Sequence, residues 1–500
     1  MGGVFDNLIL GFGVAFSLQN LLFCFLGILI GTLVGVLPGL GPIAALAMLL
    51  PATFYLPPIS ALIMLAGIYY GSQYGGSTTA ILVNMPGESS SVVTCLDGYQ
   101  MARNGRAGAA LATAALGSFF AGTVATGLIV FVGPPLSRIA IQFGTAEYFS
   151  LMVLGLTGSI ILARGSLLKA VAMTFLGLFL GLVGTDTNSG IQRMTLGIAD
   201  LYDGVSITAL AIALFGISEM LTNLARTDSP KEIAVIGRLM PTRDEFRRAF
   251  PAVLRGTAIG SLLGLLPGGG ALLASFGAYA VEKRISRTPE KFGHGAIEGV
   301  AAPEAANNAG AQTSFIPMLT LGLPSNPVMA LMIGALMLQG ITPGPRIIVT
   351  QPDLFWGLIA SMWIGNVMLV VLNLPLVGIW VSLFRVPYRL LFPSILLICC
   401  IGVFSVSNST FDVISLVVLA LLGHVFVTLG CEPAPLLLGF ILGPLLEENL
   451  RRALMLSEGD PMIFLQRPVS AGLLIAAALL FLLVVKPSVR SVRDEAFKEG

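Results

Sequence analysis

Charged residues are scarce throughout this sequence. Only 11% of its 500 residues are Asp, Glu, Lys or Arg, whereas 55% are hydrophobic, and the mean hydropathy is +0.91. Soluble domains carry roughly 25% charged residues, so this composition cannot supply a water-facing surface. Apolar stretches recur from end to end, enough for about ten to twelve spans of ~20 residues each. We therefore expect an all-α integral membrane protein in a lipid bilayer.

Several chemical signatures are also missing. The sequence has no Gly-x-x-x-x-Gly-Lys-Ser/Thr loop, no His-Glu-x-x-His pair and no basic patch with interleaved aromatic residues. These absences argue against ATP hydrolysis, metalloprotease chemistry and nucleic-acid binding. The five cysteines show neither metal-ligand nor disulfide spacing. The N-terminus lacks the basic leader of a signal peptide, so we expect it to be part of the mature protein.

The few charges are unevenly distributed, which predicts the topology. No charged residue or histidine lies between Asn7 and Gly87. We assign alternate loops to the cytoplasm in the part of the chain up to Arg255. This assignment places eleven basic residues in the cytoplasm and only Arg138 and Arg193 on the other side. The positive-inside rule then fixes the orientation of this half. After residue 57, we predict that this half crosses the membrane at 58–86, 107–133, 145–162, 166–184 and 206–221.

A polar segment in mid-chain divides the protein into two halves. We predict a first membrane repeat at 1–221, a cytoplasmic linker at 222–255, a second membrane repeat at 256–486 and a cytoplasmic tail at 487–500. The path between 431 and 469 stays open, because the apolar run Leu436–Leu446 is short for a span.

An internal duplication is the most informative feature of the sequence. The segment GTLVGVLPGLG at 31–41 recurs as GSLLGLLPGGG at 260–270, with seven of eleven positions identical. Proline removes a helical hydrogen-bond donor and glycine permits unusual backbone angles, so each helix should break near Pro38 or Pro267. Broken backbone at membrane depth is tolerated where it is buried in protein or lines a wet cavity. Paired breaks in two halves are typical of transporter binding sites.

Flanking charges suggest how the two breaks are oriented. The second copy lies between Arg255 and a basic cluster that begins at Lys283, so both of its ends should face the cytoplasm. This pattern predicts a re-entrant hairpin with Pro267 and Gly268 near its tip. Five predicted crossings separate the copies, which makes the two repeats inverted. The alternative is that each Pro-Gly pair merely kinks an ordinary spanning helix.

Small polar residues follow each break, where a membrane segment should be apolar. Hydroxyls and amides donate directed hydrogen bonds to an oxyanion, helix N-termini add positive partial charge, and freed carbonyls can hold Na⁺. Each hydroxyl has an alternative role in packing between helices. The candidate substrate- or ion-binding residues are Pro38, Gly39, Gly41, Ser77, Thr78, Thr79, Asn84, Pro267, Gly268, Gly269, Gly270, Glu304, Asn307, Asn308, Gln312, Thr313, Ser314, Ser325 and Asn326.

Two ionisable residues lie in apolar surroundings. Glu304 is the leading candidate for ion coupling or gating, and the alternative is an interfacial carboxylate paired with Lys291 or a neighbour. His424 is a lone membrane histidine, which we interpret as a hydrogen-bond partner between helices rather than a proton relay.

These motifs resemble a known family. GTLVGVLPGLGPIAAL, YGGSTTAILVNMPGE, LDGYQMARNGRAGAAL, EGVAAPEAANNAG, TLGLPSNP and ITPGP are similar to the large membrane subunit of tripartite tricarboxylate transporters, over about residues 15–470. The resemblance implies a small four-helix membrane subunit and a periplasmic solute-binding protein as partners. It also implies a multi-pass location in the bacterial inner membrane and carboxylate uptake by symport with Na⁺ or H⁺. No other cofactor is implied.

One segment departs from the family pattern. Family members often read Gly-Ile-Pro-Gly-Ser, whereas this chain reads Gly-Leu-Pro-Ser-Asn at 322–326, so its carboxylate need not be citrate. Analogy alone suggests an elevator motion of the two hairpins. A self-sufficient organic-anion symporter is an alternative. An intramembrane hydrolase is a remote one, because it needs a catalytic dyad or metal site that the sequence does not provide.

Overall fold

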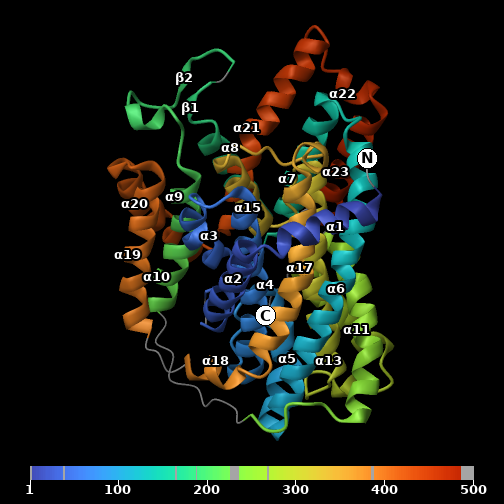
Figure 1. Ribbon diagram of the computed structural model, residues 1–500. Helices are drawn as coiled ribbons and strands as arrows, with labels where there is room; N and C mark the ends of the chain where they lie inside the picture. The colour runs from blue at the N-terminus through green and yellow to red at the C-terminus, as the bar shows by residue number, and fades with distance from the viewer. Residues whose placement is uncertain are drawn as a thin grey trace.

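A computed structural model describes residues 3–37, 40–163, 166–186, 188–225, 236–266, 270–383 and 388–485. The described residues form a bundle of helices, with one short β-hairpin near its upper end (Figure 1). In this hairpin Gly184 pairs with Arg193 and Thr185 pairs with Gln192 in antiparallel fashion. The all-α membrane fold that composition predicts is confirmed.

The elements of the first half are α1 (Val4–Ala15), α2 (Leu18–Val36), α3 (Pro42–Thr53), α4 (Pro58–Val83), η1 (Ser89–Ser91), α5 (Val92–Met101), η2 (Ala102–Arg106), α6 (Ala107–Ala140), α7 (Thr145–Leu162), α8 (Leu167–Gly181), β1 (Gly184–Thr185), β2 (Gln192–Arg193), η3 (Ala199–Leu201), α9 (Ile207–Ala211), η4 (Ile212–Ile217) and α10 (Ser218–Ala225). The elements of the second half are α11 (Arg243–Gly264), α12 (Gly270–Ile285), η5 (Pro289–Lys291), α13 (Glu298–Thr313), α14 (Phe315–Leu321), α15 (Pro327–Leu338), α16 (Ile347–Thr350), α17 (Pro352–Asn373), α18 (Val377–Leu383), α19 (Tyr388–Ser407), α20 (Thr410–Thr428), α21 (Pro433–Leu456), α22 (Ile463–Gln466) and α23 (Pro468–Val485).

Apolar helices account for most of this bundle. Among the described residues, four helical segments are long and apolar enough to cross a bilayer, and eight more are apolar but shorter. Helices occupy all five crossings predicted for the first half. The segment 431–469, whose path the sequence does not predict, forms α21 followed by the short α22. Helix α11 begins at Arg243, inside the segment predicted as a linker.

The first duplicated segment forms a hairpin with α2 and α3 as its arms. The Ser60 hydroxyl at the start of α4 donates to Asn20 Oδ1 near the start of α2, over 2.7 Å. Only four residues separate the end of α3 from α4, so α3 ends close to where α2 begins. The chain therefore runs out along α2 and returns along α3, as a re-entrant hairpin requires.

The second duplicated segment forms the matching hairpin with arms α11 and α12. Arg255 on α11 pairs with Glu282 on α12, with 3.0 Å between Arg255 Nη2 and Glu282 Oε2. The ion pair joins the middle of α11 to the last turn of α12, and Gly277 on α12 lies against Leu263 on α11, so the two arms run in opposite directions. Both ends of this segment lie on the same side, as the basic flanks predicted.

Close backbone packing explains the duplicated glycines. A Cβ atom on Gly31 would lie 2.3 Å from the carbonyl oxygen of Ile68 on α4, and one on Gly260 would lie 2.3 Å from that of Ala306 on α13. These distances are too short for any side chain, so only glycine lets the helices approach this closely. In both repeats the glycine-bearing arm runs parallel to the helix that follows the hairpin.

The two repeats are oppositely oriented. Gln73 Nε2 on α4 donates to Asn307 Oδ1 over 3.1 Å, and the Ser77 hydroxyl one turn later lies 2.7 Å from Glu304 Oε2, one turn earlier on α13. Helices α4 and α13 are therefore antiparallel where they touch. Because each is parallel to its own hairpin arm, the hairpins enter from opposite sides, as predicted.

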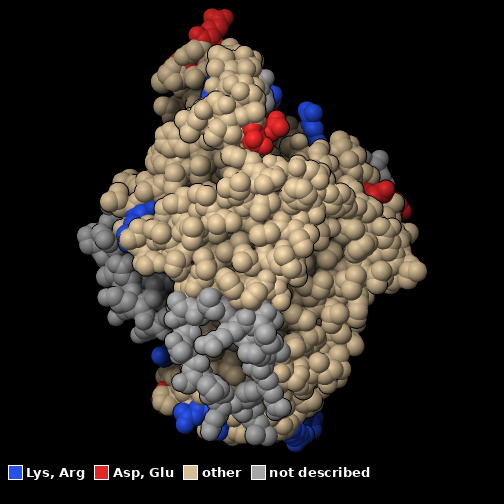
Figure 2. Space-filling model, turned by 90° about the vertical axis from the view of Figure 1, so that its left-hand side faces the viewer, with Lys and Arg blue, Asp and Glu red and all other residues tan. Residues whose placement is uncertain are grey.

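Charged side chains are unevenly spread over the face that Figure 2 shows. The visible Lys, Arg, Asp and Glu residues lie in its upper part or near the bottom, and the described surface between them is uncharged. Such an uncharged region is what a bilayer core requires of the surface that it covers.

Candidate functional site

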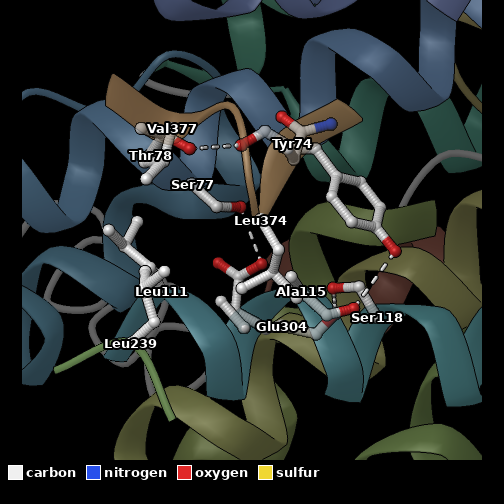
Figure 3. A pocket seen from close by; sticks show the side chains of 12 residues that line it. Tyr74, Ser77, Thr78, Leu111, Ala115, Ser118, Leu239, Glu304, Leu374 and Val377 are labelled. Carbon is white, nitrogen blue, oxygen red and sulfur yellow. Dashed lines mark hydrogen bonds between the residues drawn. The ribbon is translucent and has the colours of Figure 1, made fainter. Parts of the chain in front are cut away.

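The antiparallel crossing of α4 and α13 forms one wall of a pocket (Figure 3). Its space is about 380 Å³, the open mouth included. Helix α6 provides a second wall, and the loop residue Leu239 and the α17–α18 junction complete the lining. The polar residues that line it are Tyr74, Ser77, Thr78, Ser118, Glu304 and Asn373.

Glu304 is the one ionisable carboxylate in the lining of this pocket. Its side chain is 1% exposed. Thr94 on α5 donates to Glu304 Oε1 over 2.5 Å, and Ser77 Oγ lies 2.7 Å from Oε2. No ion pair between Glu304 and Lys291 is present in the described part of the chain. The carboxylate is thus held by hydroxyls of the first repeat.

Asn307 and Asn308 extend the same network on α13. Asn307 Nδ2 donates to Glu88 Oε1 over 2.8 Å, while its Oδ1 accepts from Gln73. Asn308 Nδ2 donates to Ser118 Oγ on α6 over 2.6 Å and to the Glu304 carbonyl over 3.1 Å. The two amides therefore join α13 to three different segments of the first repeat.

A second polar cluster lies where the second hairpin turns back. Ser314 donates to the Gly310 carbonyl over 2.7 Å and accepts from Asn326 Nδ2 over 3.3 Å. Asn326 caps α15, because its Oδ1 accepts from the Met329 amide. A Cβ on Gly270, the first residue of α12, would lie 3.1 Å from Asn326 Nδ2. Tyr69 on α4 interacts with both Asn326 and Glu88, which links the two clusters.

The other candidate residues have more local contacts. Gln312 Oε1 accepts from Thr126 on α6, and the Thr313 hydroxyl donates to the Ala309 carbonyl within α13. Ser325 lies 3.5 Å from the Ser314 carbonyl. Thr79 donates to the Gly76 carbonyl. The positions outside the described residues are Pro38, Gly39, Pro267, Gly268 and Gly269.

Two candidates occupy the ends of helices. Gly41 is the N-cap of α3 and lies near the Gly87 carbonyl. Asn84 is exposed and adopts a left-handed conformation at the C-terminus of α4, with φ of 55°. Gly322 takes the corresponding place after α14, with φ of 70°. The sequences that follow these two residues, Met-Pro-Gly-Glu88 and Leu-Pro-Ser-Asn326, are therefore structural counterparts.

The structure adds residues that the sequence analysis did not select. Glu88 ends the long uncharged stretch and follows Pro-Gly as Asn326 follows Pro-Ser. A comparison of the two repeats could therefore have identified Glu88 from the sequence. No sequence pattern indicates Thr94 and Ser118, because they lie on α5 and α6, away from the duplicated segment. Among the described residues, no group of three His, Cys, Asp or Glu side chains suits a metal ion.

Comparison with known proteins agrees with this architecture. A family model described as the tripartite tricarboxylate transporter TctA family matches residues 21–438. The chain belongs to this family.

The relatives of this TctA chain include two proteins of Agrobacterium vitis. The first, "Uncharacterized 52.8 kDa protein in TAR-I ttuC' 3'region", is 57% identical over 501 residues and covers 100% of both chains. The second, "Uncharacterized protein in TAR-II ttuC' 3'region", is 60% identical over 240 residues, which are 48% of this chain and 99% of the relative. No solved structure matches the chain.

Proposed function

We propose that this chain is the large permease subunit of a secondary transporter that imports a carboxylate by cation symport. The family is one of tripartite transporters, so the proposal includes a small membrane subunit and a periplasmic binding protein as partners in the bacterial inner membrane. The observation that carries it is the crossing of two inverted repeats at a buried polar pocket. Paired, inverted and broken segments around such a site are the usual architecture of secondary transporters.

The two polar clusters suit different solutes. Glu88 and Glu304 lie in one cluster, where negative charge attracts a cation and repels an anion. The other cluster offers the amide of Asn326, the hydroxyl of Ser314 and the N-terminus of the 12-residue helix α15. Helix N-termini and amide donors favour a carboxylate. The carboxylate is thus proposed at the second hairpin and the coupling cation beside Glu304.

Replacement of Asn307 and Asn308 together by Ala tests this assignment. Uptake of labelled citrate and succinate is measured in vesicles that contain the permease, its membrane partner and the binding protein. We expect uptake to fall at least about tenfold, because the bond of Asn307 to the Glu88 carboxylate is one to a charged group, and such a bond contributes roughly 1.5–3 kcal/mol. The matched control is Asn449→Ala, since Asn449 bonds only within its own helix α21 in the described contacts.

The outcomes separate the proposed functions. Unchanged uptake by the double variant, at normal membrane content, contradicts the site. Equal uptake by this chain alone in liposomes, without the binding protein, favours a self-sufficient anion symporter instead.

A further inference from the structure

The neighbours of Glu304 offer its carboxylate no positive charge. Within the described residues, the pocket lining holds no Lys or Arg, and Glu304 has no ion pair. An isolated ionised carboxylate is costly to bury, and such a group takes up a proton instead. Glu304 is 1% exposed where α4 and α13 cross, so a negative charge on it is costly.

The charged groups on the surrounding helices do not change this balance. The titratable and charged side chains that face α13 are Tyr74 on α4, Glu88 beside η1, Asp97 on α5, Tyr279 and Glu282 on α12, and Arg248 and Arg255 on α11. The two arginines are bound to Glu298 and Glu282. Glu88, which is bonded to Asn307 on the same helix, has the same sign of charge as an ionised Glu304 and cannot balance it.

The contacts of the Ser77 hydroxyl accommodate a proton on Glu304. Ser77 Oγ lies 3.0 Å from the Gln73 carbonyl oxygen and 2.7 Å from Glu304 Oε2. A hydroxyl has a single proton to donate, so Ser77 cannot serve both acceptors. If Glu304 carries a proton on Oε2, it donates to Ser77, and Ser77 donates to the Gln73 carbonyl. Thr94 then donates to Glu304 Oε1, and each short contact contains one hydrogen.

We infer that the coupling ion of the proposed transporter is a proton, carried as an O–H group on Glu304 Oε2; this inference rests on the proposed function. A proton from one side of the membrane forms the O–H bond, and the same bond breaks when the proton leaves to the other side. Ser77 and Thr94 belong to the first repeat and Glu304 to the second. A movement of one repeat relative to the other therefore separates Glu304 from its hydroxyl partners and changes the proton affinity of its carboxylate.

Infrared spectroscopy of the purified full chain in lipid tests protonation directly. We expect a carbonyl band of a buried carboxylic acid at neutral pH, which disappears at high pH and is absent from Glu304→Gln. The matched control is Glu298→Gln on the same helix, which keeps the band because Glu298 is ion-paired with Arg248. Ser77→Ala retains the carboxyl group but removes its hydrogen-bond acceptor, so the band should shift without loss. A wild-type spectrum without the band, or a band unchanged in both Glu304→Gln and Ser77→Ala, overturns the inference.

Transport in vesicles then tests coupling. Labelled citrate and succinate are supplied with a pH gradient or a Na⁺ gradient imposed separately. We expect the pH gradient to drive accumulation in wild type and Glu298→Gln, with loss of this driven component in Glu304→Gln. Accumulation that is driven by Na⁺ and independent of the pH gradient contradicts the inference that the coupling ion is a proton, and leaves the proposed carboxylate transport standing. Failure of the wild-type complex to take up either carboxylate contradicts the proposed function, and the infrared band still decides whether Glu304 is protonated.

Discussion

The two hairpins share a backbone design and differ in their charges. In both, a glycine-bearing arm packs parallel to a following helix, so closely that a Cβ on Gly31 or Gly260 would collide with a backbone carbonyl. The first hairpin lies within a stretch that has no charge from Asn7 to Gly87. The second carries two ion pairs, Arg255 with Glu282 between its arms and Arg248 with Glu298 between α11 and α13.

The two repeats share the residues that pack the helices together and differ in the residues that supply polar and charged groups. The shared glycines set the distance between helices, and therefore serve packing in both halves. The structural counterparts Glu88 and Asn326 differ, with a carboxylate in one repeat and an amide in the other. A symmetric scaffold thus carries asymmetric chemistry, as the proposed symport of two unlike solutes requires.

The largest predicted difference between the hairpins is the side from which they can be labelled. Cysteines at Arg255 and Lys283 should react with a membrane-impermeant thiol reagent from one side only. Cysteines at Ser17 and Tyr55, at the two ends of the first hairpin, should react only from the other side. Reaction of Arg255→Cys and Lys283→Cys from opposite sides would replace the second hairpin with a spanning helix and remove the inverted arrangement.

The shared packing predicts equal loss of stability in the two halves. Gly31→Ala and Gly260→Ala each place a methyl group against a carbonyl oxygen 2.3 Å away, and overpacking of this kind costs about 3 kcal/mol or more. Thermal unfolding in detergent measures the effect. Gly13→Ala and Gly127→Ala are matched controls in helices with no atom within 4 Å of the added methyl, and alanine should stabilise them slightly. Damage from only one of the two substitutions would contradict the equivalence of the hairpins.

The connection between the halves predicts a further loss at Asp97. Asp97 Oδ1 on α5 accepts from the amides of Gly293, Gly295 and Ala296 over 2.8–2.9 Å, and Oδ2 accepts from Tyr279. Asp97→Asn weakens these bonds and should destabilise the protein by about 3 kcal/mol, since bonds to charged groups are the strong ones.

Tyr279→Phe is the graded comparison for Asp97→Asn. It removes one of these bonds and should cost about 1 kcal/mol in the same unfolding measurement. Equal stability of wild type and Asp97→Asn would show that α5 does not hold the second repeat.

Outside both hairpins, the smallest predicted effect is a local response to acid. Arg451 and the Ser189 hydroxyl bind Asp186 next to the β-hairpin and hold the pKa of that carboxyl well below its usual range. A lowered pKa contributes stability that is present above the unfolded value of about 3.9 and lost as pH falls below it. The protection factor of the 184–193 segment against hydrogen exchange, which is corrected for the intrinsic effect of pH, should therefore fall at acid pH. Asp186→Asn should exchange faster at neutral pH and lose this acid response, and an unaltered response in that variant contradicts the assignment.

The sequence predicted the architecture because duplication, charge and hydropathy are all linear features. The uncharged stretches located the crossings, and the registered glycines located the close helix contacts. The network around Glu304 was only partly predictable. Thr94 and Ser118 reach it from α5 and α6 through tertiary packing, which leaves no local pattern. His424 was correctly interpreted as a partner between helices, since its Nδ1 lies 3.3 Å from the Thr222 hydroxyl.

Protection of Ser314 by substrate tests the central claim most directly. In a background free of native cysteines, Ser314→Cys is exposed to a membrane-permeant thiol reagent with and without saturating carboxylate and the binding protein. Ser314 lies beside Asn326 in the cluster where the carboxylate is proposed to bind, so bound carboxylate should slow its modification severalfold. Modification of Cys introduced at Thr157 on α7, which bonds only within its helix in the described contacts, should not change. Equal rates at Ser314 with and without carboxylate would contradict a carboxylate site at the second hairpin.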